Sequence, residues 1–136
     1  MKYLVDANIL SEPTKPQPDE TVIDWLRRNE RAIAVDPIIL GELRFGIDLL
    51  PSGRRRKRLE DWFDCGVGRI TCLDWTRETG LCWAGILAAM RAAGTAMPVK
   101  DSLIAATALT HRLTVVTRNV TDFCTAGVDV LDPFEA

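Results

Sequence analysis

The chain has 136 residues and a formal net charge of −2, with 47% hydrophobic and 26% charged residues. This length suits one domain over residues 1–136, and the ordinary globular composition excludes a disordered chain, a collagen and a coiled coil. Because basic residues are not in excess, a nucleic-acid site would have to come from a local patch.

Short apolar runs alternate along the chain with helix-start signals. The run Tyr3-Leu4-Val5 is typical of a buried strand, and Asn8 is placed to cap a short helical turn near Ile9. Five strands are predicted, over residues 3–5, 32–35, 70–73, 114–117 and 128–131. Longer helices are predicted over about 19–29, 37–50, 54–65, 75–93 and 98–111, with Asp19, Asp36 and Asp74 capping the first, second and fourth.

This alternation predicts an α/β fold. We expect one domain with a five-stranded, mostly parallel sheet, flanked by helices on both faces and joined by right-handed crossovers. Ligands of such sheets bind beyond the carboxyl ends of the strands. Acidic and polar residues that follow a strand are therefore the candidate functional residues.

Four acids are candidates: Asp6, Glu42, Asp101 and Asp122. Each has a plain structural alternative, which is a turn for Asp6, a turn or a cap for Asp122, a helix cap for Asp101, and the rim of an apolar helix stripe for Glu42. That stripe, one helix face, reads Ile38, Glu42, Phe45, Gly46 and Leu49.

Taken together, the four acids indicate a cation site. Carboxylates gathered at one sheet edge repel one another and need a compensating cation. A set of oxygen ligands without histidine or thiolate selects Mg²⁺ or Mn²⁺, and such a site suits phosphodiester hydrolysis.

Four segments, in this order along the chain, carry a resemblance to a known family. They read Leu4-Val5-Asp6-Ala7-Asn8-Ile9-Leu10-Ser11-Glu12, Gly41-Glu42-Leu43-Arg44-Phe45-Gly46, Pro98-Val99-Lys100-Asp101-Ser102-Leu103-Ile104-Ala105-Ala106-Thr107-Ala108 and Thr117-Arg118-Asn119-Val120-Thr121-Asp122-Phe123. Over essentially its whole length the chain resembles the PIN-domain ribonucleases, and among them the VapC toxins of toxin–antitoxin pairs and their FitB-like branch.

The resemblance implies a function and a set of site residues. The acidic quartet of the family falls on Asp6, Glu42, Asp101 and Asp122, which would be catalytic and hold the metal. Its polar helpers fall on Asn8, Thr117 and Asn119. The implied activity is RNA cleavage with Mg²⁺ or Mn²⁺, and the implied partners are a VapB- or FitA-like antitoxin and a second copy of the chain, in a heterotetramer or larger assembly. The RNA that is cut is left open.

Two other classes remain as alternatives. A haloacid-dehalogenase-like phosphatase also begins with a strand and an acid, but it needs a second acid where this chain has Asn8. A non-catalytic interaction module would keep the fold and tolerate loss of any single acid.

Several further features have open interpretations. The basic run from Arg54 to Arg58 is either a solvated helix face or a contact for an RNA backbone. Arg44 is expected to pair with Asp48, with a substrate role as the alternative. Large apolar residues, Trp62, Phe63, Trp75 and Trp83, are expected in the core or in a dimer contact.

The cysteines and the first residues favour a cytoplasmic protein. The four cysteines form no C-x-x-C pair, and a single histidine argues against a zinc site, so we expect reduced and mostly buried thiols. Asp6 ends the first apolar run well short of a signal-peptide core, and no run is long enough to span a membrane.

Overall fold

A computed structural model describes residues 1–135. Its five strands are β1 (Tyr3–Val5), β2 (Ile33–Val35), β3 (Thr71–Cys72), β4 (Thr114–Val116) and β5 (Val130–Leu131). They form one sheet in the order β3-β2-β1-β4-β5, and every pairing is parallel. The predicted α/β architecture is confirmed, and the sheet is wholly parallel.

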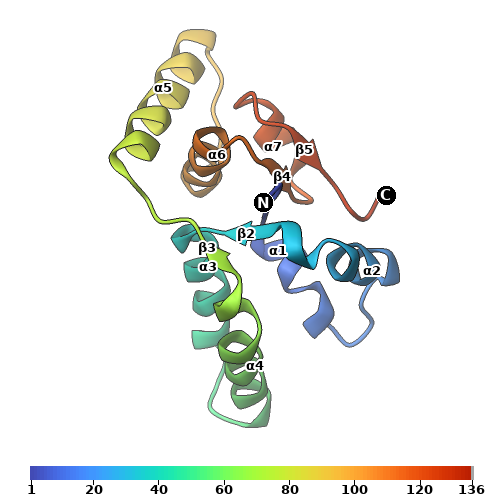
Figure 1. Ribbon diagram of the computed structural model, residues 1–136. Helices are drawn as coiled ribbons and strands as arrows, with labels where there is room; N and C mark the ends of the chain where they lie inside the picture. The colour runs from blue at the N-terminus through green and yellow to red at the C-terminus, as the bar shows by residue number, and fades with distance from the viewer. Residues whose placement is uncertain (136) are drawn as a thin grey trace.

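Helices cover both faces of this sheet. They are α1 (Ala7–Leu10), α2 (Glu20–Arg28), α3 (Pro37–Asp48), α4 (Arg54–Cys65), α5 (Arg77–Ala93), α6 (Val99–His111) and α7 (Val120–Cys124). Short 3₁₀ turns lie at Glu12–Thr14 (η1), Glu30–Ala32 (η2) and Val67–Arg69 (η3). Figure 1 shows α5, α6 and α7 above the strands, with α1 to α4 below them. Because the chain runs outward through β2 and β3 and then returns to β4, right-handed crossovers place the two helix groups on opposite faces.

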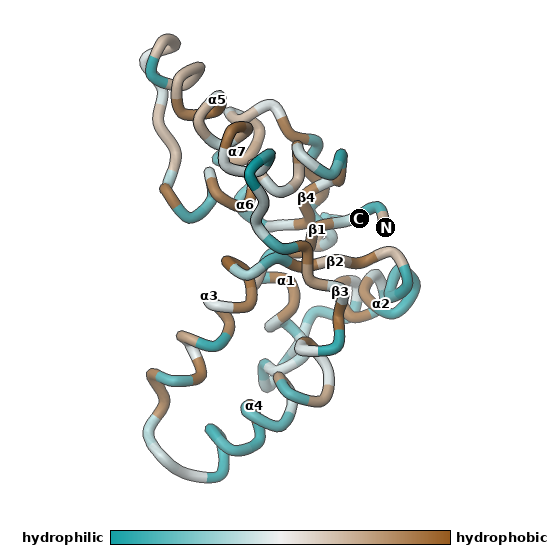
Figure 2. Tube along the Cα trace, turned by 60° about the vertical axis from the view of Figure 1, so that its left-hand side comes forward, coloured by the Kyte–Doolittle hydropathy of each residue, from teal (hydrophilic) through white to brown (hydrophobic). Residues whose placement is uncertain are grey.

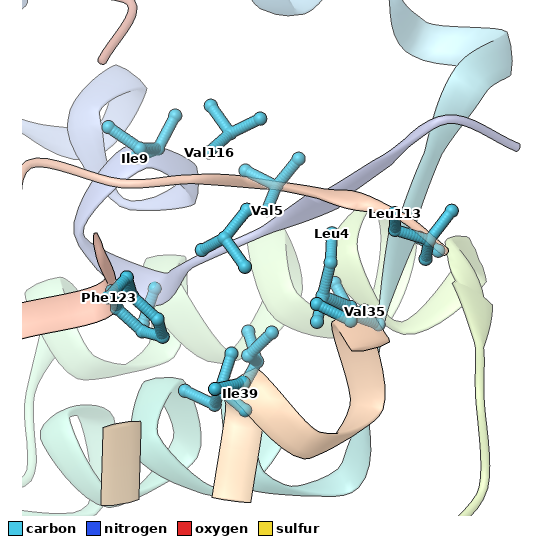
Figure 3. Close-up of a cluster of buried hydrophobic side chains, with 14 of the residues drawn as sticks. Leu4, Val5, Ile9, Val35, Ile39, Leu113, Val116 and Phe123 are labelled. Carbon is cyan, nitrogen blue, oxygen red and sulfur yellow. The ribbon is translucent and has the colours of Figure 1, made fainter. Parts of the chain in front are cut away.

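The central strand β1 lies in the core of the molecule. Leu4 pairs with Ala34 of β2 on one side and with Val115 of β4 on the other. Leu4, Val5, Val116 and the nearby Phe123 are fully buried, and Figure 3 shows their side chains gathered with those of neighbouring elements. Such strands, covered on both faces, read as continuous apolar runs, which is why the sequence located them.

Two helix boundaries differ from the sequence prediction. Helix α5 begins at Arg77 because the Thr76 and Thr79 side chains form a reciprocal capping box, so the predicted cap, Asp74, lies outside the helix. Helix α1 is capped by Asp6, whose Oδ1 accepts from the backbone N–H of Ala7 at 2.8 Å, and not by Asn8. Helix α7 contains Asp122 in its first turn, where the sequence had suggested a turn or a cap as the structural alternative.

The predicted apolar stripe on α3 was wrong. Phe45 and Leu49 are 63% and 68% exposed, whereas Ile39, Leu43 and Ile47 form the buried face of the helix. Both sets have helical spacing, and only the orientation of α3 against the sheet decides between them. Glu42 therefore lies beside the core face of α3.

The burial of the cysteines and of the large aromatic residues could be determined only from the structure. All four cysteines are free, but Cys65 and Cys124 are exposed and the other two are half-buried, so the expectation of mostly buried thiols was wrong. The four large aromatic residues, Trp62, Phe63, Trp75 and Trp83, are partly buried and pack against the core. Trp83 also donates to Ser102 Oγ at 3.0 Å, which joins α5 to α6.

Within residues 1–135, none of the helices has the length and apolar character that crossing a membrane requires.

Candidate active site

The strand order places a crevice between the carboxyl ends of β1 and β4. The chain leaves β1 toward β2 on one side, and β4 lies on the other side, so β1 and β4 flank the point where the winding direction reverses. Ligands of open parallel sheets bind at this reversal. Asp6 directly follows β1, and Thr117 directly follows β4.

Asp6 and Thr117 are joined across this crevice. Thr117 Oγ1 donates to Asp6 Oδ2 at 2.8 Å, and both residues are almost fully buried. The same hydroxyl oxygen accepts from the backbone N–H of Asn119 at 3.0 Å. Burial raises the pKa of Asp6, although the hydrogen bond from Thr117 opposes the rise. Asp6 is thus held in one orientation at the bottom of the crevice.

Asn8 ties helix α1 to the loop after β4. Its side-chain amide donates to Thr117 Oγ1 at 3.4 Å, and its Oδ1 accepts from the backbone N–H of Arg118 at 3.3 Å. Asn119 takes part through its backbone N–H, and the residue itself is exposed. The two asparagines therefore shape the loop around Thr117.

Asp101 lies in the first turn of α6, with 2% of its surface exposed. Its Oδ1 is buried and, among the described residues, has no hydrogen-bond partner, and no side-chain hydrogen bond caps the start of α6. Burial raises its pKa to about 6, helped by the charge of Asp6 and, less strongly, of Asp122 and Glu42, and opposed by Lys100. The other three predicted acids therefore lie within electrostatic reach of Asp101.

Glu42 contributes from α3, which packs against α6. Its Oε1 forms an ion pair with Lys100 Nζ, while its Oε2 is buried and unpartnered within the part of the chain that the structure describes. Burial would lower the pKa of Lys100, but the hydrogen bond to Glu42 and the neighbouring carboxylates outweigh burial and raise it. The site thus contains a cation of its own.

Sequence reasoning assigned no role to Lys100. Its position next to Asp101 in the first turn of α6 was the available signal, because a cation beside clustered acids offsets their repulsion. Asp36 was predicted only as a helix cap; it does cap α3, and it also accepts from Thr107 Oγ1 of α6 at 2.7 Å. Arg44 pairs with Asp48, as expected, and with Glu60 of α4.

Asp122 lies in α7 and is half-exposed. Over residues 1–135, no three acidic, histidine or cysteine side chains are oriented so that together they could hold one metal ion. Glu42 instead directs its Oε1 to Lys100.

The profile of the PIN domain family matches residues 3–127 of the chain. The chain belongs to the PIN-domain family. This PIN domain is 35% identical to the plasmid stability protein StbB of Pseudomonas syringae pv. tomato, over 98% of this chain and 99% of that protein. It is 34% identical to toxin FitB of Neisseria gonorrhoeae, over 96% and 97% of the two chains. It is 30% identical to VapC ribonuclease Y4jK of Sinorhizobium fredii, over 97% of each.

Solved structures agree with these relatives. The PIN domain superposes on a chain of the crystal structure of FitAcB from Neisseria gonorrhoeae with a TM-score of 0.89, at 32% identity over 98% and 99% of the two chains. A chain of the structure of FitAB bound to an IR36 DNA fragment gives a TM-score of 0.88, at 31% identity over 97% and 95%. The chain therefore belongs with the VapC and FitB toxin ribonucleases of toxin–antitoxin systems.

Proposed function

We propose that this PIN domain is a metal-dependent endoribonuclease, the toxin of a toxin–antitoxin pair, which hydrolyses RNA phosphodiester bonds at Asp6, Glu42, Asp101 and Asp122. The observation that carries the proposal is the pair of buried, unpartnered carboxylate oxygens, Asp101 Oδ1 and Glu42 Oε2. Leaving such oxygens without a partner costs free energy, which a bound cation would recover.

The residues present fit Mg²⁺ or Mn²⁺. Every candidate ligand is a carboxylate oxygen, which these hard cations prefer, and the two unpartnered oxygens come from facing helices. Asp6, Asp101, Glu42 and Asp122 would hold the ion after their side chains turn toward it, because no three of them are oriented to share one ion in the described residues. When bound, a divalent ion of this kind lowers the pKa of a water molecule and stabilises negative charge on a phosphate.

The chain's own residues position the reacting groups. Thr117 fixes the Asp6 carboxylate through its 2.8 Å hydrogen bond, as residues behind metal ligands commonly do. Asp101 Oδ1 is available to accept a hydrogen bond from the attacking water. Lys100 Nζ neutralises Glu42 and has further N–H groups that can face a phosphate. Water attacks phosphorus as the P–O3′ bond breaks, so the products are a 3′-hydroxyl and a 5′-phosphate.

The partners follow from the relatives and from the acidic site. The structures of FitAcB and FitAB support a cognate antitoxin. An arginine or lysine of the antitoxin would enter the acidic site, because clustered carboxylates attract a cation. Lys100 of the chain itself already meets Glu42, so the antitoxin cation would act on the remaining acids. The chain would also form a homodimer, and the antitoxin complex would be a heterotetramer or larger.

The test is cleavage of cellular RNAs by the purified chain with Mg²⁺, with Mn²⁺ or with EDTA, compared with Asp101→Asn. We expect cleavage with either metal, none in EDTA, and a loss of at least about 100-fold in Asp101→Asn with the fold retained. A parallel assay on a phosphomonoester should give no turnover. Cleavage that persists in EDTA, or in Asp101→Asn at the wild-type rate, would overturn the proposal.

A further inference from the structure

Two hollows extend from the acidic site along helix α4. The first, of about 310 Å³, has Asn8 and Glu42 at one end and Arg55, Leu59 and Trp62 of α4 along its wall. The second, of about 490 Å³, shares Leu59, Trp62 and Thr14 with the first and adds Arg58 and Lys15. The two hollows are therefore neighbours on either side of shared residues, and together we call them the α4 groove.

The α4 groove has Glu42 at one end, Arg55 and Arg58 along α4, and mostly apolar residues in the rest of its wall. Lys15 in that wall is paired with Glu12 at 2.8 Å. Figure 2 shows α4 as a largely hydrophilic helix. The residues of its basic run, Arg54 to Arg58, differ in whether they form ion pairs. Arg56 approaches Asp48 and Glu60, at 3.7 Å and 3.8 Å, and Lys57 pairs with Asp61 at 3.1 Å, which is the solvated-face interpretation of the run.

The other three arginines of the run are different. Arg54, Arg55 and Arg58 are exposed and form no ion pair with any described residue. Arg55 and Arg58 are also the two that line the groove. Three residues apart on a helix, they lie on the same face about 4.5 Å apart along the axis. The groove thus offers two adjacent, uncompensated guanidinium groups, which favour an anionic occupant.

We propose that the α4 groove holds single-stranded RNA to one side of the bond that is cut. This inference rests on the proposed function, because it extends the substrate from the acidic site. Arg55 and Arg58 bind successive phosphates, and the half-buried Trp62, on the wall common to both hollows, offers an aromatic surface for a base. Cationic grooves with an aromatic platform are how proteins hold single strands without reading sequence.

The experiment measures binding of a labelled single-stranded oligoribonucleotide to the full chain in EDTA, by fluorescence anisotropy over a range of salt concentrations. Arg55→Gln with Arg58→Gln is compared with Arg54→Gln with Lys57→Gln, which removes the same charge from the same helix outside the groove. We expect the groove variant to lose about tenfold in affinity and to reduce the salt slope by about 1.4, since each phosphate contact on a single strand contributes about 0.7.

The control variant should keep the wild-type slope, and circular dichroism should give the same helix content for all three proteins. Equal RNA affinity and salt slope in the groove and control variants would overturn the inference. The same holds if the groove variant loses only its binding of an acidic peptide. Binding in EDTA needs no catalysis. If wild type fails to cleave RNA while the groove variant still binds less well than the control, the proposed function fails and the groove stands.

Discussion

Asp101 has the most perturbed environment among the acids of the site. It is buried at the start of α6, one oxygen is unpartnered within residues 1–135, and three other acids add to the effect of burial on its pKa, which rises from 3.8 to about 6. A carboxyl group with a raised pKa in the folded state holds its proton more tightly there than in the unfolded chain. Keeping Asp101 charged without a cation therefore costs the fold stability.

This cost predicts how the stability of the metal-free protein depends on pH. In EDTA, the free energy of unfolding of the wild type should fall relative to Asp101→Asn as pH rises from about 4 to about 7, by up to roughly 3 kcal/mol. The folded form releases the proton only near pH 6, whereas the unfolded form releases it near pH 4. Urea unfolding at several pH values measures the difference, with Glu30→Gln, at an exposed position outside the acidic site, as the control. Parallel pH profiles for wild type and Asp101→Asn would contradict the prediction.

Helices α3 and α6 carry Glu42 and Asp101, and a buried carboxylate joins them. Asp36 is fully buried; its Oδ1 accepts from the backbone N–H of Ile39 at 2.9 Å and its Oδ2 from Thr107 Oγ1 at 2.7 Å. The first bond fixes the start of α3 and the second reaches the middle of α6. Asp36 thus sets how these two helices lie against each other. It thereby also sets the relative positions of Glu42 and Asp101.

Removing the Thr107 hydroxyl should uncouple the two helices. Thr107→Val leaves Asp36 Oδ2 without its donor, and the unfolding free energy should fall by roughly 1–3 kcal/mol. Thr107→Ser keeps the donor and should retain most of the stability. Thr110→Val is a matched control, because Thr110 Oγ1 bonds only to Ala106 O within α6. Denaturant unfolding measures the stability of the three variants. Equal losses of unfolding free energy in Thr107→Val and Thr107→Ser would show that the hydrogen bond is unimportant.

Elements that the local sequence pattern determines were predictable. Elements that depend on tertiary packing were less predictable. The buried strands and the stop of α5 at Gly94, with φ 68°, follow from apolar runs and from a glycine suited to a left-handed cap. The buried face of α3 and the start of α5 depend on helix orientation and on side-chain capping between threonines. The Lys100–Glu42 pair joins residues 58 positions apart, so only the packing of α3 against α6 brings them together.

At the scale of the whole molecule, apolar surface remains on helix α5. Leu81 is 64% exposed, and Ala84 and Ala88 follow on the same exposed face at helical spacing. An exposed apolar face on a small domain is typical of a surface that a partner covers. The large aromatic residues Trp62, Phe63, Trp75 and Trp83 pack against the core. Helix α5 is therefore the better candidate for the contact between two copies.

A homodimer through α5 predicts a specific effect of charge. Leu81→Glu should shift the sedimenting species from dimer to monomer, because a carboxylate would be buried against apolar surface. Leu49→Glu is the matched control, since Leu49 is a similarly exposed leucine at the C-cap of α3, and it should remain dimeric. Analytical ultracentrifugation at several concentrations measures both. A wild-type chain that sediments as a monomer at high concentration would rule out the dimer.

The parallel strand order also bears on how the protein is made. Strand β1 is synthesised first, yet Asp6 N–H bonds to Val116 O at 2.9 Å, and Lys2 O accepts from Thr114 N–H at 3.0 Å. The ribosome adds Asp101, Thr117 and Asp122 only in the last third of the chain, long after Asp6. A nascent chain therefore has no assembled acidic site until the segment from Asp101 to Asp122 has also been made. Under the proposed function, copies that stop before this segment would be harmless to the RNA around them.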